Sequence, residues 1–492
     1  MKELSITALA KIIDTRVIAS HDAGQNVTSV STDSRTVTPG DCFFAIIGPN
    51  FDGHNFLADA FAKGASCAVV SKDVPPFVAQ RRRVPPNQFP DLSGVAQAKS
   101  DKIILKVEDT VKALGVLASW YRKDCNFKVI AITGSVGKTT TREIIHHVLS
   151  AVGETSPMGG SKRFKTFQSP KNFNNFIGLP LSILTAPADS QILVLELATN
   201  HPGEIEYLSR IAAPDIALIT NVAPAHIEGF HDLESLAKEK LSISEGLNPS
   251  GILIINADCP VLFTLAHKQH KRFLSFGSKE HCDYRAYCVH YEGLSSDFEL
   301  DGADIHLPLP GRGNVENALA AWAVCSTLGI SERDFADAVK TISPVSMRTE
   351  MLKLGSLTVI SDCYNANPAS MKNALDILAT LAKKENRRAV FVCGDMAELG
   401  NQTEKFHVEL GRFIASSNVN LLLTVGHLAL LAADTSKNES PLLETHSFTQ
   451  SAQLCDNLHK LIKDSDIILV KGSRINKLET VVEKLKAIYP GS

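Results

Sequence analysis

Short apolar runs rich in β-branched residues recur along most of the chain, and each is followed by a turn and a helical pattern. In the middle of the chain they are KVIAI, QILVLEL, DIALI and GILII. Runs that are continuously apolar indicate a sheet covered on both faces, and their alternation with helices predicts parallel strands. Such a sheet binds ligands at the carboxyl ends of its strands.

The same alternation restarts near Met347, after the linker-like segment TISPVSMRTE. The runs LTVISD, AVFVC, NLLLTV and DIILV predict a second, independent doubly wound unit. Shorter runs in the first hundred residues, DCFFAII and ASCAVV, fit a small α/β domain. The predicted fold is therefore α/β with three domains: a small N-terminal domain at 1–107, a central domain with a mainly parallel sheet at 108–343, and a Rossmann-like C-terminal domain at 344–492.

Composition adds limits to this picture. A chain of 492 residues is too long for one core and predicts about three domains of roughly 150 residues. Fifty Lys and Arg against 53 Asp and Glu leave a charge of −3, so neither nucleic acid nor an acidic membrane is an expected partner. The ten cysteines form no C-x-x-C pair, and Cys67 and Cys393 lie in apolar runs. We expect reduced core cysteines, no membrane insertion and a cytoplasmic location.

The segment AITGSVGKTTT carries the clearest candidate chemistry. A strand runs into a glycine turn, a lysine and the start of a helix, although Ile132 stands where the strict P-loop pattern has glycine. Backbone N–H groups and the helix N-terminus would bind phosphate, Lys138 would reach the β and γ phosphates, and the Thr139 hydroxyl would hold Mg²⁺. The alternative is a plain glycine turn before a helix. The residues expected to bind ATP here are Gly134, Ser135, Val136, Gly137, Lys138, Thr139 and Thr140.

Two further side chains follow strand ends of the same sheet. Glu196 ends an apolar strand, where a carboxylate can bind Mg²⁺. An ion pair with a neighbouring lysine is the alternative for this acid. His226 follows another strand in NVAPAHIEGF. One histidine alone is more often structural, so it counts only together with the others.

Lys240 stands out by helical spacing. In DLESLAKEKLSISEGL, a rotation of about 100° per residue places Lys240 within an apolar stripe, whereas Lys238 points away. The ammonium could extend to solvent or pair with an acid. A carbamate on its nitrogen would instead make it an acidic metal ligand.

These motifs together resemble one known family. TGSVGKTTT, ELATNHPGEI, NVAPAHIEGF with AKEK behind it, and PGRGNVENALAA are similar to the ATP-dependent Mur ligases of peptidoglycan synthesis, whose shortened loop has the form T-G-x-x-G-K-T. That form accounts for Ile132. The resemblance implies that Lys240 is carbamylated, that Glu196 and His226 bind two magnesium ions, and that Asn317 faces the adenine.

The two ends of the chain resemble the family member that acts last in the pathway. STDSRTVTPGDCFFAIIGPNFDGHNFL is similar to the uridine-nucleotide domain shared by the last two ligases of the pathway, with Ser34 and Arg35 in its D-S-R motif, and DCYNANPASM and GDMAELG are similar to the final one. The resemblance implies a monomer that joins D-alanyl-D-alanine to UDP-N-acetylmuramoyl-tripeptide. Arg348 would touch the phosphates and Asp362 the ribose. The remaining expected substrate contacts are Asn172, Asn174, Asn175, Asn365 and Asn367.

Some features depart from that pattern or leave alternatives. SKRFKTFQ precedes SPKNFNNFIGLP, and a loop with paired prolines and three arginines interrupts the N-terminal domain. Turn formation beside Pro368 is an alternative role for Asn365 and Asn367. A folylpolyglutamate synthase-like ligase, or a nucleotide-dependent switch without ligase activity, are the other functions considered. Folylpolyglutamate synthase-like ligases lack a uridine-type N-terminal domain. A nucleotide-dependent switch does not need the set Lys138, Glu196, His226 and Lys240.

Overall fold

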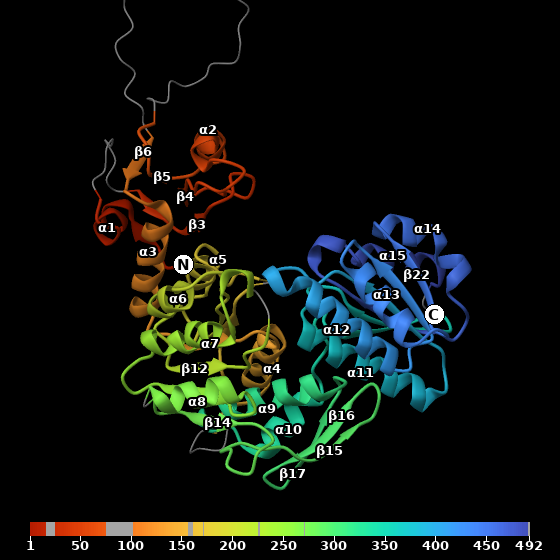
Figure 1. Cartoon of the computed structure of the whole chain (residues 1–492). Coiled ribbons are helices and arrows are strands. Elements are labelled where there is room, and N and C mark those ends of the chain that lie inside the picture. The colour runs from red at the N-terminus through yellow and green to blue at the C-terminus, as the bar shows by residue number, and fades with distance from the viewer. Residues whose placement is uncertain are drawn as a thin grey trace, which may run out of the picture. The chain divides into compact units, whose positions relative to one another are not determined.

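The computed structural model describes residues 1–15, 25–74, 102–155, 161–170, 172–224, 227–269 and 271–490 (Figure 1). It divides into two compact units. The first unit consists of Met1–Lys128, Ser169–Leu193 and Ile211–Ala213, and the second of Val129–Gln168, Val194–Arg210 and Pro214–Ser492.

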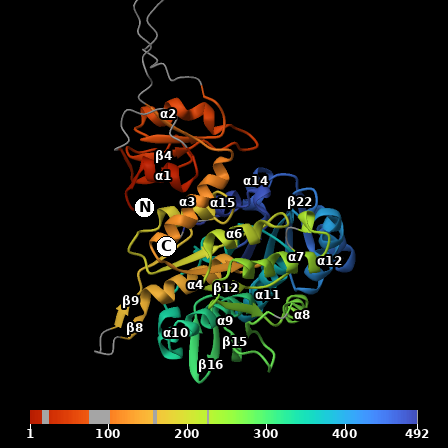
Figure 2. The ribbon, with the colours of Figure 1, turned by 90° about the vertical axis from the view of Figure 1, so that its left-hand side faces the viewer.

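The first unit contains the small α/β domain expected at the N-terminus. Four parallel strands pair in the order β3-β4-β5-β6, and α2 packs its apolar side on this sheet through Leu57, Ala60 and Phe61 (Figure 2). Cys42 and Cys67 face each other across β4 and β5 as free thiols, as the sequence predicted for the core cysteines. The elements of this unit are β1 (Leu4–Ser5), α1 (Ile6–Ile12), β2 (Asn26–Val27), β3 (Ser29–Ser31), β4 (Asp41–Phe44), η1 (Gly53–Phe56), α2 (Leu57–Ala62), β5 (Cys67–Val70), β6 (Ile103–Lys106), α3 (Thr110–Asp124) and α5 (Gly178–Thr185).

The central sheet has six strands in the order β10-β11-β7-β12-β13-β14. β7 pairs in parallel with β12, which pairs in parallel with β13, so the carboxyl ends of these strands share one edge. All four residues of β12 are buried, which explains their unbroken apolar sequence. The elements are β7 (Lys128–Thr133), α4 (Lys138–Ala151), β10 (Thr166–Gln168), β11 (Ile192–Glu196), α6 (Glu204–Ala212), β12 (Ile216–Ile219), η2 (Ile227–Gly229), α7 (Leu233–Leu241), η3 (Ser242–Gly246), β13 (Ile252–Asn256), α8 (Pro260–Lys268), β14 (Leu274–Phe276), α9 (Arg312–Thr327) and α10 (Glu332–Val339).

Two antiparallel features of this region were not predicted. A hairpin joins β8 (Gly153–Thr155) to β9 (Ser161–Arg163), and a three-stranded sheet contains β15 (Tyr287–Tyr291), β16 (Ser296–Leu300) and β17 (Ala303–Leu307). Burial alternates along β16, because one face of this sheet is exposed. The search for continuous apolar runs therefore passed over these strands.

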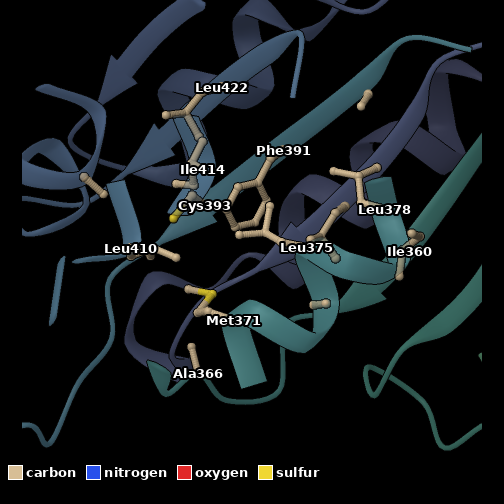
Figure 3. Close-up of a cluster of buried hydrophobic side chains, with 14 of the residues drawn as sticks. Ile360, Ala366, Met371, Leu375, Leu378, Phe391, Cys393, Leu410, Ile414 and Leu422 are labelled. Carbon is tan, nitrogen blue, oxygen red and sulfur yellow. The ribbon is translucent and has the colours of Figure 1, made fainter. Parts of the chain in front are cut away.

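The C-terminal sheet is the doubly wound unit that the sequence predicted. Its order is β18-β19-β23-β20-β21-β22, and all pairs are parallel except that of the edge strand β18. Helices cover both faces over separate apolar clusters. In one of them, Met371 and Leu375 of α11 face Phe391 of β20 (Figure 3). The elements are β18 (Glu350–Leu354), β19 (Leu357–Asp362), α11 (Pro368–Glu385), β20 (Ala389–Gly394), η4 (Gly400–Gln402), α12 (Thr403–Ser416), β21 (Leu421–Val425), α13 (Ala429–Glu439), β22 (Glu444–Phe448), α14 (Ser451–Leu461), β23 (Ile467–Lys471), η5 (Arg474–Asn476) and α15 (Glu479–Ile488).

The α/β fold class is thus confirmed, and each predicted domain contains a sheet of its own. The boundaries 1–107, 108–343 and 344–492 stay a prediction. The loop with paired prolines and arginines falls in 75–101, outside the described residues. Across the residues that are described, no helix has both the length and the apolar character needed to span a bilayer.

Candidate active site

The turn between β7 and α4 has room only for glycine at two positions. Gly134 and Gly137 have φ angles of 150° and 88°, and Gly137 caps α4 in the left-handed region. A Cβ atom at Gly134 would lie 1.9 Å from Oγ1 of Thr220, and one at Gly137 would lie 2.1 Å from Oδ1 of Asn317. The glycine turn expected from the sequence is therefore present and is closely packed against Thr220 and Asn317, while its binding of phosphate stays a prediction.

Polar groups from the loop after β12 fix this turn. Oγ of Ser135 donates to the carbonyl oxygen of Ala223 at 2.8 Å and accepts from its N–H at 3.0 Å. The Val136 N–H donates to Oδ1 of Asn221 at 2.9 Å, and Oγ1 of Thr220 donates to the Val136 carbonyl at 2.6 Å. The first N–H groups of α4, at Lys138 and beyond, have no acceptor in a preceding turn of helix and can bind an anion.

Lys138 begins α4 and folds back over the turn. Its Nζ donates to the Gly134 carbonyl at 2.8 Å. Burial lowers the pKa of Lys138, the nearby Glu196 carboxylate opposes this shift, and the charge of Arg348 lowers the pKa further.

Glu196 ends β11 beside the first turn of α4. Its Oε2 accepts a hydrogen bond from Oγ1 of Thr139 at 2.8 Å, and Nη1 of Arg142 lies 3.5 Å from the same oxygen. The alternative of a neighbouring lysine stays open, because the Glu196 carboxylate also acts on the charge of Lys138. A buried carboxylate and a hydroxyl at hydrogen-bonding distance are oxygen donors of the kind that Mg²⁺ prefers.

His226 and Ala225 lie outside the described residues, so the structure does not test the role of this histidine. Within the described ranges, no group of three or more His, Cys, Asp or Glu side chains is arranged to hold a metal. The donor chemistry of Thr139 and Glu196 nevertheless fits magnesium, with water and phosphate oxygens completing the coordination.

Lys240 lies on the buried face of α7, as its helical position predicted. It is 3 % exposed, whereas the Lys238 side chain is 56 % exposed and pairs with Glu234 at the surface. Throughout the described part of the chain, no hydrogen-bond or ion-pair partner of Lys240 Nζ is found. Burial lowers the pKa of Lys240 well below its usual value, and the charge of Lys138 adds to this shift. The ammonium form is thus disfavoured at this place.

Glu239, next to Lys240, has a structural role that the sequence analysis did not identify. Its carboxylate accepts from the N–H groups of Gly203 at 2.7 Å and Ile205 at 2.8 Å, and from Oγ1 of Thr199 at 3.2 Å. These groups lie at the start of α6, whose N-terminus favours a negative charge. Glu239 therefore fixes the loop that follows Glu196. A carboxylate beside Lys240 was visible in AKEK, but its partners were not.

The C-terminal candidates are organised by an ion pair that the sequence analysis also missed. Nζ of Lys471, at the end of β23, lies 2.6 Å from Oδ2 of Asp362, at the end of β19. Burial raises the pKa of Asp362 and Lys471 opposes the shift. The Arg348 guanidinium stacks 4.2 Å from the Tyr364 ring. Asp362 and Arg348 are thus held near one another, and the Thr349 N–H donates to Oδ1 of Asp362 at 3.2 Å.

Asn365 and Asn367 show the turn-forming role considered as the alternative. Oδ1 of Asn367 accepts from the Ser370 N–H at 2.9 Å, and the Ser370 hydroxyl accepts from the Asn367 N–H at 3.0 Å. This capping box starts α11. Oδ1 of Asn365 accepts from the Ala366 N–H at 2.8 Å. Contact of either asparagine with the substrate stays a prediction.

The remaining predicted substrate residues belong to the first unit. Asp33, Ser34 and Arg35 form a turn in which the Arg35 guanidinium lies 2.7 Å from Asp33 and lowers the pKa of that carboxyl to about 2. Oδ1 of Asn175 accepts from the Gly178 N–H at 2.9 Å in the turn that leads into α5. No bound substrate tests Ser34 and Arg35, nor the asparagines Asn172, Asn174 and Asn175.

Replacing Gly137 by alanine is expected to lower the free energy of unfolding by about 1–3 kcal/mol, because the new methyl group meets Asn317 and the φ angle is left-handed. Gly302→Ala is the matched control. Gly302 has a φ angle of 93° but no atom within 4 Å of its Cβ position. Chemical denaturation should therefore show a smaller loss for Gly302→Ala, and equal losses would contradict the close packing behind the loop.

Sequence comparison identifies relatives that match nearly the whole chain. UDP-N-acetylmuramoyl-tripeptide–D-alanyl-D-alanine ligase of Bacillus subtilis (strain 168) is 33% identical over 462 residues, which cover 93% of each chain. The chain belongs to the Mur ligase family. The ligase of the same name from Escherichia coli (strain K12) is 32% identical and covers 94% of this Mur ligase chain and 95% of its own.

Domain profiles place the family segments along this Mur ligase. The Mur ligase family catalytic domain matches residues 26–122, the Mur ligase middle domain 132–325, and the Mur ligase glutamate ligase domain 347–474. The middle segment begins at Ile132, the residue that departs from the strict P-loop pattern. Lys138, Glu196 and Lys240 all fall within it.

Solved structures are similar over the same extent. MurF from Acinetobacter baumannii has a TM-score of 0.83 and 28% identity, with 99% of both chains covered. MurF ligase from Thermotoga maritima, solved in complex with ADP, has a TM-score of 0.74 and 26% identity, covering 94% of this chain and 97% of its own. The three-part architecture of this Mur ligase is therefore that of MurF structures.

Proposed function

We propose that this Mur ligase joins D-alanyl-D-alanine to UDP-N-acetylmuramoyl-tripeptide at the expense of ATP, giving the pentapeptide, ADP and phosphate. The observation that carries the proposal is the match of all three segments to ligases named for this reaction, over 93% of the chain. The loop, Glu196 and buried Lys240 supply matching chemistry in the middle segment. We also propose that the protein acts as a monomer in the cytoplasm, where ATP and the nucleotide-linked precursor are made available.

The phosphate loop is proposed to bind ATP. The ADP complex of the Thermotoga maritima neighbour supports this assignment. Backbone N–H groups of Gly137 and the first turn of α4 would bind the phosphates, and Lys138 would exchange its contact with the Gly134 carbonyl for a phosphate oxygen. Asn317, half-buried against the turn, is proposed to face the adenine, and Asp362 the ribose.

The reaction needs activation because a carboxylate is a poor electrophile. A carboxylate oxygen of the tripeptide attacks the γ-phosphorus of ATP, the bond to ADP breaks, and an acyl phosphate forms. The neutral amine of the dipeptide then attacks the acyl carbon, phosphate leaves, and a proton is released. Phosphoryl transfer depends mainly on positioning and on compensating charge. Lys138 provides one positive charge over the phosphate loop, and Arg348 is proposed to contribute a second.

Thr139 and Glu196 are the described residues proposed to hold magnesium, together with His226 and Lys240 if its nitrogen carries a carbamate. When bound, magnesium neutralises phosphate charge and orients the γ-phosphate. Glu239 keeps the loop after Glu196 in place and thus supports this carboxylate indirectly.

Fewer contacts in the structure support the sites proposed for the nucleotide-linked tripeptide and for the dipeptide. Ser34 and Arg35 are proposed to contact the uridine nucleotide. The tripeptide is proposed to contact Asn172, Asn174 and Asn175. Asn365 is proposed for the dipeptide side. Asn367 is already engaged as a helix cap, so its side chain would act by shaping the turn.

A phosphate-release assay tests the proposal directly. ATP hydrolysis should accelerate only when UDP-N-acetylmuramoyl-tripeptide and D-alanyl-D-alanine are both present, and mass spectrometry should show the pentapeptide. Release of phosphate with a folylpolyglutamate precursor and glutamate would support the alternative ligase. No release with any pair would support the switch and reject the ligase proposal.

A further inference from the structure

The segment SKRFKTFQ ends in β10, the edge strand of the central sheet next to β11. Its last residue, Gln168, contacts the buried Arg142 of α4. Arg142 is 3 % exposed and lies one helical turn after Thr139. A guanidinium so deeply buried requires anionic or polar partners, because the charge has been removed from water.

Two hydrogen bonds of Arg142, and a third between its two partners, fix the orientation of its side chain. Its Nε donates to Oε1 of Gln168 at 3.0 Å, and its Nη2 donates to Oε1 of Glu143 at 2.7 Å. Nε2 of Gln168 donates to Oε2 of Glu143 at 2.8 Å, which closes a triangle. The plane of the guanidinium is therefore determined from two sides.

The remaining nitrogen of Arg142 is directed at the metal-binding carboxylate. Nη1 lies 3.5 Å from Oε2 of Glu196, the oxygen that also accepts from Thr139. A carboxylate held between a fixed cation and a fixed hydroxyl loses little rotational freedom when it binds an ion.

We propose that Arg142 is a positioning residue that orients Glu196 for magnesium, and that Gln168 of the SKRFKTFQ segment holds Arg142 in place. The proposal rests on the magnesium-binding role of Glu196 within the proposed function. Arg142 acts through Glu196 and does not touch the substrates. A purely structural role, in which Arg142 only joins α4 to β10, would leave the metal affinity unchanged.

Calorimetric binding of the ATP analogue AMP-PNP to the full chain at a series of MgCl₂ concentrations separates these roles. Arg142→Lys keeps the charge but loses the forked geometry. The half-saturating magnesium concentration should rise about 10- to 100-fold, the range typical when a group that orients a metal ligand is replaced. Binding of AMP-PNP in EDTA should not change. Gln168→Ala should produce a smaller rise in the same direction.

Arg210→Gln is the matched control, because Arg210 forms an exposed pair with Glu206 at 2.8 Å on α6. It should leave the magnesium dependence unchanged. A folded Arg142→Lys protein with native magnesium dependence would overturn the proposal. If Arg142→Lys does not fold, Gln168→Ala decides in the same way. AMP-PNP binding requires neither peptide substrate. The change in the half-saturating magnesium concentration can therefore be measured whether or not the ligase assay succeeds.

Discussion

Lys138→Ala is expected to lower kcat for phosphate release by about 10²- to 10³-fold, the loss typical when one preorganised charge contact is removed from an active site. Lys138 is the first residue of α4, and its Nζ already lies over the phosphate loop, 2.8 Å from the Gly134 carbonyl. No other side chain in the described turn between Gly134 and Gly137 carries a positive charge. Steady-state kinetics with both peptide substrates and ATP would measure the effect.

The control for this variant is Lys128→Ala. Lys128 is exposed at the start of β7, the strand that leads into the same loop. Its replacement removes an equal charge from the protein and should leave kcat unchanged. If Lys138→Ala retains native turnover, Lys138 does not contact the transferred phosphate and the proposed role of the loop is wrong.

Lys240→Ala is expected to lower ligation by at least about 10²-fold if its nitrogen carries a carbamate that binds magnesium. The buried amine has no described partner, and its lowered pKa favours the neutral form that can attack CO₂. In that step an N–C bond forms and one proton is released. Native enzyme in CO₂-depleted buffer should therefore lose activity, and added bicarbonate should restore it.

Lys238→Ala provides the comparison on the same helix. Lys238 is exposed and pairs with Glu234 at 2.9 Å, so its removal should change neither activity nor the response to bicarbonate. Full activity of Lys240→Ala would exclude a carbamate at this position. Bicarbonate-independent activity of the native enzyme would do the same.

Local patterns in the sequence predicted the sheets and the position of single side chains. Strands of the parallel sheets are buried on both faces, so they appear as unbroken apolar runs such as KVIAI. Helical spacing placed Lys240 on a buried face because that spacing depends on the backbone alone. Strands β16 and β17 were missed because their burial alternates, and β15 was missed because it is largely exposed.

Contacts between distant segments could not be predicted in this way. Lys471 and Asp362 are separated by 109 residues and meet only because β23 inserts next to β19. Arg142 and Glu196 meet because α4 crosses the end of β11. Glu196 and Asp362 were expected as site residues, but their partners Arg142 and Lys471 appeared in the sequence as ordinary charged residues.

Glu239 and Lys240 are neighbours in the chain with separate tasks. Glu239 accepts three hydrogen bonds at the start of α6, whereas Lys240 has no described partner. In a mutational scan scored by cell growth, substitutions at both positions would reduce growth, so the scan would not distinguish them. A scan that also scores protein abundance would separate them, because substitutions of Glu239 would deplete the protein and those of Lys240 would leave an abundant but inactive one.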